Sequence, residues 1–439
     1  MKPPRRIGIL GHVGNGNLGD EAIIDALLRG VRGVIPEAEF IALTIRPADT
    51  EARHRIPSFP LRRGLAPAPT APSAVVPASS APSASSGVRS LVRRIPGLGD
   101  LLAAGAAALR WIGDMAGEAA FWGQRFRLMR RVDLLIVAGS NQLSDYYGGP
   151  WGFPYTLWAW SAAARLAGAR VAFLSVGAGP IRARSSGLLI RMALALSSYR
   201  SYRDAGSRDA IAAIRVPGPH VIAPDLAHGL RPAAPSGAMT ALEGARLIVI
   251  NPLPYFDPRS WAERDAGVYQ RYVDTMAEFA VALRARGYRV RFVPTQLRAD
   301  PLVIADILRA IERSSGTAEE LTPLAAVVSN FEDLVAHLSE ANIVVAARFH
   351  GVLISQMLGK PTIGIVYRRS TRDLLVDVGQ GAYAIDIEEM TATGLLERLS
   401  ALERDSDAGD RIQRRLEEYR RELEAQYAVL LGTNDTDHP

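Results

Sequence analysis

The segment Arg348-Phe349-His350-Gly351 brings a cation and an imidazole together within four residues. It follows the apolar run Ile343–Ala346, which is typical of a buried strand, and it precedes residues 352–358, whose pattern predicts a helix. A loop at this point offers a fixed cation, backbone N–H groups and a titratable side chain. This set fits an anionic substrate that needs proton transfer, although a histidine at a strand end can also be a purely structural residue.

A second chemical segment is the glycine-rich loop Gly14-Asn-Gly-Asn-Leu-Gly19, which Asp20 and Glu21 follow. It lies between a strand-like run at residues 7–10 and a run with helical spacing of apolar residues. Acidic residues at a helix N-terminus complement the helix dipole, and they also repel a phosphate that would dock there. The loop is therefore better suited to sugar hydroxyls than to a nucleotide pyrophosphate. The alternative is that both acids are only helix-terminal residues.

Strands, loops and helices alternate in two blocks around these motifs. Strands are predicted at residues 7–10, 38–43, 132–137, 171–176 and 199–202, and then at 247–250, 289–293, 343–346 and 362–366. This order predicts an α/β protein with two facing Rossmann-like domains and a central cleft. We expect domains at residues 1–230 and 231–405. A C-terminal helix and tail at 406–439 are expected to cross back onto the first domain.

Two further loops follow predicted strands in the first block. They are Gly177-Ala-Gly179-Pro180 and the segment that begins with Arg203-Asp204. In open parallel sheets the loops at the carboxyl ends of the strands build the ligand site. These two loops are therefore expected to face the same cleft as the first two motifs.

Two segments do not follow this alternation of strands and helices. Residues 65–87 are almost wholly Ala, Pro, Ser and Thr, a composition that predicts a disordered insertion. Residues 98–130 have a helical pattern. Its interrupted apolar stripe of Trp111, Met115, Trp122, Phe126 and Met129 is expected to pack on the domain core or, alternatively, to contact a membrane surface peripherally.

Composition excludes several classes of function. The 439 residues include 48% hydrophobic and 22% charged residues, as in ordinary globular proteins, and the net charge of +6 is carried almost entirely by arginine. The chain has no cysteine, so disulfides and thiolate chemistry are excluded. The seven histidines show no metal-ligand spacing, and no basic run with interleaved aromatics indicates nucleic-acid binding. Without a signal peptide or a membrane-spanning run, the protein is expected in the cytoplasm, either free or peripheral to the inner face of the membrane.

Taken together and in order, the motifs resemble the polysaccharide pyruvyltransferase family. The resemblance rests on Gly-Asn-Leu-Gly-Asp-Glu-Ala near the start, on Gly177-Ala-Gly-Pro, on Arg203-Asp204 with Ser207, and on Arg-Phe-His followed by Gly359-Lys-Pro-Thr-Ile-Gly-Ile-Val-Tyr367. It covers most of the chain outside the insertion. The family implies a fold like that of the two-domain GT-B glycosyltransferases.

The resemblance also implies a reaction. Phosphoenolpyruvate would be the donor, with no further cofactor and no metal, and a sugar of a glycan or lipid-linked saccharide would be the acceptor and form a 4,6- or 3,4-linked pyruvate ketal. Arg203, Arg348 and His350 would surround the donor, and the loop with Asn17, Gly19, Asp20 and Glu21 would face the cleft on the acceptor side. Gly177 and Gly179 would belong to the same substrate-binding surface. The oligomeric state is not predicted.

The expected mechanism adds a sugar hydroxyl at C2 of phosphoenolpyruvate with protonation at C3, after which phosphate leaves and a second hydroxyl closes the ketal. His350 would be either the acid or a hydrogen-bond donor to the phosphate. Asp20 or Glu21 would be the base toward the acceptor.

The chain departs from the family pattern at two places. Ala138-Gly-Ser140 stands where a glycine triplet is common, and Ser370 stands where a lysine is usual. Arg369 is expected to supply the replacement cation, because Arg368 and Arg372 would point the other way in an extended loop. The alternative is that all three are solvated surface arginines. Two other functions stay open: a nucleotide-sugar glycosyltransferase of the same architecture, and a non-catalytic glycan-binding relative.

Overall fold

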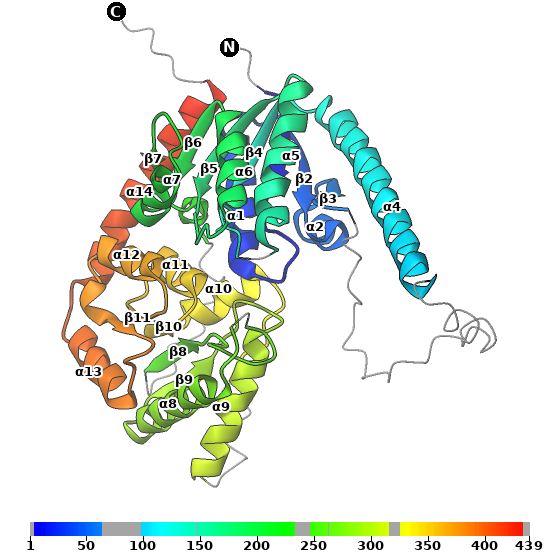
Figure 1. Cartoon of the computed structure of the whole chain (residues 1–439). Coiled ribbons are helices and arrows are strands. Elements are labelled where there is room, and N and C mark those ends of the chain that lie inside the picture. Colours follow the sequence, from blue (N-terminus) through cyan, green and yellow to red (C-terminus); the bar gives the residue numbers. More distant parts are fainter. Residues whose placement is uncertain are drawn as a thin grey trace, which may run out of the picture.

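The computed structural model describes residues 4–63, 98–146, 148–232, 246–261, 263–315 and 325–432, with no side chains described for 98–112. The predicted disordered insertion at residues 65–87 lies outside these ranges. Two parallel sheets, one above the other in Figure 1, form the cores of two α/β domains, as the alternating pattern predicts.

The first domain has a seven-stranded sheet in the order β3-β2-β1-β4-β5-β6-β7, in which every pair is parallel. Its central strands are buried on both faces, which is why they read as continuous apolar runs in the sequence. The bounds are β1 Arg6–Leu10, β2 Glu39–Thr44, β3 Ser58–Pro60, β4 Leu134–Ala138, β5 Arg170–Val176, β6 Tyr199–Tyr202 and β7 Val221–Ile222. Its helices are α1 Leu18–Val34, α2 Pro47–His54, α4 Leu98–Met129, α5 Phe153–Leu166, α6 Arg184–Ala195 and α7 Ala205–Ala213.

The second domain has a five-stranded parallel sheet in the order β12-β11-β10-β8-β9. Its strands are β8 Leu247–Asn251, β9 Arg289–Phe292, β10 Ile343–Ala346, β11 Thr362–Val366 and β12 Ala384–Asp386. Its helices are α8 Ala266–Ala285, α9 Asp300–Ser315, α10 Phe331–Ser339, α11 Phe349–Met357, α12 Arg369–Asp377 and α13 Ala392–Glu403.

The C-terminal helix α14, Ala408–Leu431, returns to the first domain, as its amphipathic pattern predicts (Figure 1). The buried amide of Gln426 joins β5 and β6: its Oε1 accepts from Ser201 Oγ at 2.5 Å, and its Nε2 donates to Ser175 Oγ at 3.2 Å. Tyr427 packs over Gly30 of α1, where a Cβ would lie only 2.4 Å from the tyrosine ring. The last helix therefore ties the second domain to the first.

Helix α4 runs past the edge of the body in Figure 1. Of its predicted apolar stripe, Met129 is buried, and Trp122 packs on Trp158 of α5 and donates to Tyr155 Oη at 3.0 Å. Met115 and Phe126 are exposed instead. The side chain of Trp111 lies outside the described part. The stripe thus divides between the core and the surface.

Candidate active site

A cleft of about 370 Å³ lies between the two domains, where the carboxyl ends of both sheets face each other. All the sequence motifs except the Gly177–Gly179 segment contribute to its wall. The first domain supplies His12, Asn15, Asn17, Asp20, Ser140, Asn141, Ser144, Tyr146, Phe153 and Arg203. The second supplies Pro254, Ser260, Trp261, Thr295, Gln296, Ala299, Arg348, Phe349, His350, Tyr367, Arg368, Ser370 and Thr371.

The glycine-rich loop joins the two domains through its backbone. Leu18 N donates to Thr295 O at 2.9 Å, and Leu297 N donates to Gly16 O at 2.8 Å. Between these bonds, Asn17 caps α1, because its Oδ1 accepts from Gly19 N at 3.2 Å. The predicted site residue Asn17 therefore lies at the cleft, and its side chain also fixes the start of the helix.

Arg348 lines the cleft at the N-cap of α11 and is held by Asp300, a carboxylate that the sequence pattern did not single out. Arg348 Nε donates to Asp300 Oδ1 at 3.0 Å, and Nη2 donates to the same oxygen. Asp300 is fully buried, and its other oxygen accepts from the backbone N–H of Thr295 and Gln296. A buried carboxylate anchored in this way fixes the orientation of the guanidinium.

His350 is the second residue of α11 and is buried beneath the glycine-rich loop. Gly19 makes this position possible, because a Cβ there would lie 1.9 Å from His350 Cγ. The Nε2 atom is buried and has no hydrogen-bond partner among the described residues. Burial lowers the pKa of His350, against the opposing charges of Asp20 and Asp225. A neutral imidazole can donate a hydrogen bond to an anion, and it must first gain a proton to act as an acid.

Arg203 follows β6 and lies across the cleft, with its guanidinium 4.2 Å from the centroid of the Phe349 ring. Its Nη1 is 3.6 Å from the buried Asp225 Oδ2. Gly177 does not line the cleft; it leaves room for this arginine, since a Cβ there would be 2.8 Å from Arg203 Nε. Gly179 acts similarly toward Asn141, whose Nδ2 would lie 2.7 Å from an added Cβ. The two glycines therefore support the site without forming its wall.

Helices α11 and α12 both begin at the cleft. Their N-cap residues are Arg348 and Arg368, and neither N-cap side chain bonds to the helix backbone. The first N–H groups of a helix without a side-chain cap remain available to a ligand, and the helix dipole favours an anion there. Together with Arg203 of the first domain, these two helix starts of the second domain make this part of the cleft suited to a phosphate and a carboxylate.

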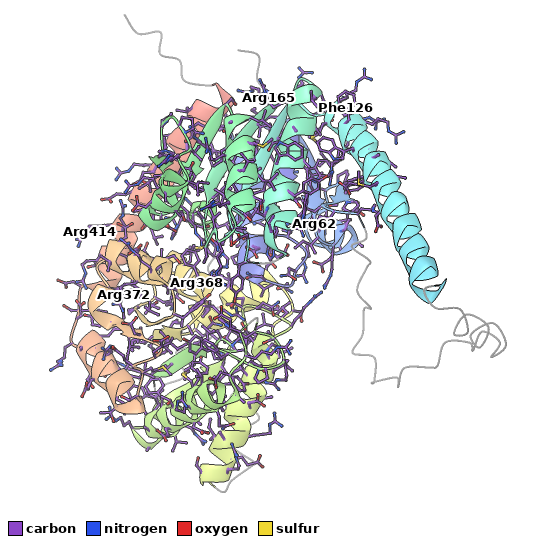
Figure 2. All side chains as sticks on the ribbon, viewed as in Figure 1. Arg62, Phe126, Arg165, Arg368, Arg372 and Arg414 are labelled. Carbon is purple, nitrogen blue, oxygen red and sulfur yellow. The ribbon has the colours of Figure 1, made fainter. Side chains whose placement is uncertain are left out.

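The expectation that Arg369 supplies the replacement cation is wrong for the geometry observed. Arg369 is the first residue of α12, its side chain is 75% exposed, and it pairs with Asp373 one turn later at 3.6 Å. Arg368, which is labelled in Figure 2, lines the cleft instead, as Ser370 does. The prediction assumed an extended loop, but the helix begins at this point, and so the residue that caps it faces inward.

We expect Arg368→Ala to weaken phosphoenolpyruvate binding by about ten- to a hundredfold, because a charge-assisted contact contributes roughly 1.5–3 kcal/mol. The adjacent Arg369→Ala is the matched control and should leave the dissociation constant unchanged. Isothermal titration calorimetry measures both. Equal losses in the two variants would show a general charge effect, not a contact made by Arg368.

Asp20 lies at the cleft, as predicted, although only 3% of the residue is exposed. Its Oδ2 lies 3.1 Å from Nδ1 of His12, a histidine that follows β1 and that sequence reasoning missed. Burial opposes the charge of Asp20, but the hydrogen bond and charge of His12, with those of neighbouring groups, lower its pKa. The position of His12 after a strand was the available signal, since several loops at the carboxyl ends of the strands line the cleft.

Glu21 was expected to face the cleft, and the structure corrects this. Its Oε1 accepts from Gly14 N at 3.0 Å, and its Oε2 is 2.7 Å from Nε2 of His54 in α2. The other nitrogen of His54 is 2.9 Å from Asp25 Oδ1. Successive residues of a helix point about 100° apart, so Asp20 faces the cleft and Glu21 faces away. Glu21 therefore stabilises the glycine-rich loop from the side that faces away from the cleft.

The His54 network should make stability depend on pH. Burial opposes protonation, but the bonds to Asp25 and Glu21 raise the pKa of His54 from 6.5 to about 9. The folded protein thus holds this proton more tightly than the unfolded chain. The network stabilises fully below pH 6.5, and its contribution is lost as pH rises toward 9. We expect the unfolding free energy of the wild type to fall by about 3 kcal/mol more than that of His54→Gln over this range in urea titrations. Parallel curves for the two proteins would contradict this.

The Ala138-Gly139-Ser140 departure leaves the close backbone approach intact. Gly177 N donates to Ser140 O at 2.7 Å. Gly139 and Ser140 both have positive φ, 46° and 55°. Serine in this left-handed region costs roughly 1 kcal/mol relative to glycine. The departure therefore affects backbone strain more than access.

Among the described residues, no group of three or more His, Asp and Glu side chains is arranged to hold a metal ion. The described helices include none long and apolar enough to cross a membrane. In the described lining of the cleft, the side chains that are charged or titrate near neutral pH are three arginines, two histidines and one aspartate, and two helix N-termini lie beside them.

Two Rossmann-like domains with a cleft at their facing strand ends define the GT-B class of glycosyltransferases and epimerases. A putative UDP-N-acetylglucosamine 2-epimerase from Listeria monocytogenes superposes with a TM-score of 0.56 at 11% identity, covering 100% of this chain and 99% of that one. The UDP-GlcNAc 2-epimerase from Neisseria meningitidis gives 0.52 at 11% identity, covering 98% and 100%. These similarities show the fold alone.

A comparison of the sequence with models of protein families identifies the family of this chain. The model of the polysaccharide pyruvyl transferase family matches residues 17–369, and the chain belongs to this family. The match covers the end of the glycine-rich loop from Asn17 onward, Arg203 and the Arg-Phe-His segment. No curated protein matches the chain in sequence.

Proposed function

We propose that the protein transfers a pyruvyl group from phosphoenolpyruvate to a sugar of a cell-surface or extracellular polysaccharide precursor, forming a ketal and releasing phosphate. The observation that carries this proposal is the cationic wall of the cleft, where Arg203, Arg348 and Arg368 lie with the starts of α11 and α12. Phosphoenolpyruvate has both a phosphate and a carboxylate. Forked guanidinium groups and free backbone N–H groups bind both.

The opposite wall suits the acceptor. It presents the amides of Asn15, Asn17 and Asn141 and the aromatic rings of Tyr146 and Phe153. Amides bind hydroxyls without requiring a charge, and aromatic rings pack on the apolar faces of sugars. A volume of about 370 Å³ lies within the usual range for ligand pockets.

The roles then divide between the walls. Arg348 and Arg203 bind the carboxylate and phosphate of the donor, and they stabilise the negative charge that collects on the leaving phosphate. His350 donates a hydrogen bond to the phosphate. Bound phosphate would raise the pKa of His350 again by its negative charge, so that the imidazolium could also supply a proton.

The alternative of a nucleotide-sugar glycosyltransferase is less well supported. Such an enzyme needs an acidic residue of the second domain for the ribose. The described cleft lining from the second domain contains neither aspartate nor glutamate. The epimerase neighbours do not change this, because a common fold does not fix function.

The decisive experiment supplies phosphoenolpyruvate and a panel of p-nitrophenyl hexosides with free 4- and 6- or 3- and 4-hydroxyls, without nucleotide or divalent metal. Phosphate release and a new ketal methyl signal in proton NMR are expected. Phosphoenolpyruvate should also raise the melting temperature, because it binds only the folded protein. Stabilisation by UDP but not by phosphoenolpyruvate would replace this proposal with the glycosyltransferase.

We further propose that the enzyme acts in the cytoplasm and contacts the inner face of the membrane through α4, where a lipid-linked acceptor would be found. The support is the exposed Met115 and Phe126 on this helix, and Figure 2 labels Phe126 near its body end. Apolar side chains on a projecting helix can enter the headgroup region. Sedimentation with phosphatidylglycerol-containing vesicles should fall in Met115→Glu/Phe126→Glu. Equal sedimentation of the variant and the wild type would contradict this contact.

A further inference from the structure

His12 is the second histidine of the described cleft lining, and it comes from the domain opposite His350. Its side chain is 20% exposed and lines the cleft directly after β1. The ring is held on two sides: Nδ1 lies 3.1 Å from Asp20 Oδ2, and the ring of Phe153 lies 5.4 Å away between centroids. Contacts within the protein therefore fix its position.

The partner of His12 decides which ring nitrogen carries the proton. Asp20 is the third residue of α1, where the helix dipole favours a negative charge, and its pKa is lowered despite burial. An ionised carboxylate only accepts hydrogen bonds, so Nδ1 of His12 must donate. Neutral His12 then has its lone pair on Nε2. The pair thus has the arrangement of an imidazole base oriented by a buried carboxylate.

We propose that His12 is the base that takes the proton from the attacking hydroxyl of the acceptor, with Asp20 as its positioning residue. The inference rests on the proposed function and deepens it. Its place in the cleft suits the acceptor side, because His12 comes from the first domain, whereas Arg348 and Arg368 come from the second. Asn15 and Asn17, whose amides suit sugar hydroxyls, line the same cleft and also come from the first domain.

The chemical step balances. The hydroxyl O–H bond breaks, its proton moves to His12 Nε2, and the oxygen bonds to C2 of phosphoenolpyruvate. The C2=C3 π pair forms a C–H bond at C3 with a proton from the His350 imidazolium. The C2–O bond to phosphate then breaks with its electron pair. The second hydroxyl oxygen bonds to C2 as its O–H bond breaks, and this proton passes to the released phosphate. The proton on His12 returns through solvent to His350. In the net reaction, one of the two hydroxyl protons ends on C3 and the other on phosphate. No oxidant or reductant is needed.

Three measurements test the proposal: the rate of phosphate release, the binding of phosphoenolpyruvate and the tautomer of His12. In His12→Ala, phosphate release from phosphoenolpyruvate with the hexoside panel should fall by at least about 10²-fold, as expected for a lost proton-transfer group. Added imidazole should restore part of it. The dissociation constant for phosphoenolpyruvate should change by less than about threefold, because the arginines are untouched. His337→Ala, outside the cleft, is the matched control and should show neither the loss of turnover nor the rescue by imidazole.

Nitrogen NMR of the ¹⁵N-histidine-labelled protein, assigned with His12→Gln, tests the geometry without an acceptor. The expected state at pH 8 is Nδ1–H with unprotonated Nε2, and Asp20→Asn should abolish this preference. An Nε2–H tautomer in the wild type overturns the inference, as does a His12→Ala variant that keeps wild-type turnover.

The two proposals fail in different ways. A wild type that neither binds phosphoenolpyruvate nor releases phosphate removes the pyruvyltransferase proposal, and this inference with it. A wild type that turns over while His12→Ala remains fully active, or while imidazole restores nothing, removes only the role of His12.

Discussion

Arg348→Ala is expected to weaken phosphoenolpyruvate binding by roughly a hundredfold, since a fixed guanidinium contributes up to about 3 kcal/mol through charge-assisted bonds. It should also destabilise the fold. Asp300 is fully buried, and removal of its cation leaves an unpaired charge that costs about 3–5 kcal/mol. Calorimetric titration and urea unfolding measure the two effects separately.

The double variant Arg348→Ala/Asp300→Asn separates binding from folding. The amide oxygen introduced by Asp300→Asn can still accept from the backbone N–H of Thr295 and Gln296, so most of the stability should return. Binding should not return. Arg246→Ala, which removes a surface arginine paired with Glu403, is the matched control for loss of charge. Recovery of donor binding in the double variant would exclude Arg348 from the donor site.

Gly19→Ala is expected to abolish turnover although it adds only a methyl group. The added Cβ would lie 1.9 Å from His350 Cγ, so the imidazole or the whole start of α1 must move. Misplacement by about 1 Å is enough to reduce turnover about 10²-fold, and overpacking costs about 1–3 kcal/mol. Phosphate release and the melting temperature are the measurements.

Gly33 in the same helix provides the matched control. A Cβ at Gly33 would have no atom within 4 Å, so Gly33→Ala should leave turnover unchanged and stabilise the helix by about 0.5–1 kcal/mol. Gly19→Ala/His350→Gly should recover stability without recovering activity, because glycine at position 350 also removes the Cβ that would lie 2.3 Å from the added methyl group. A Gly19→Ala protein with normal turnover would show that the two helix starts separate freely.

The sequence was most informative where chemistry follows a strand. Continuous apolar runs reveal strands that are buried on both faces of a parallel sheet, and the residues after them must lie at one edge. Asn17, Asp20, Arg203, Arg348 and His350 were predicted in this way, and all line the cleft. His12 follows a strand as well and could have been included by the same rule.

The incorrect or missing predictions concern side chains whose direction depends on where a helix begins or on a partner that is distant in the sequence. Glu21 faces away because α1 turns it toward His54, which is 33 residues later in the chain. Arg369 faces solvent because α12 begins there, and a change of one residue in a helix start reverses which side chain enters the cleft. No local sequence pattern indicated Asp300, since this residue holds Arg348, which lies 48 residues later in the chain.

The sequence by itself determined the two-domain fold, the family and the loops around the cleft, because strand periodicity and motif order are local properties of the chain. The tertiary structure alone decided which arginine lines the cleft with Ser370, that Glu21 stabilises the glycine-rich loop and that His12 pairs with Asp20. These facts depend on side-chain direction and on contacts between distant segments, which become fixed only when the helices pack and the domains meet.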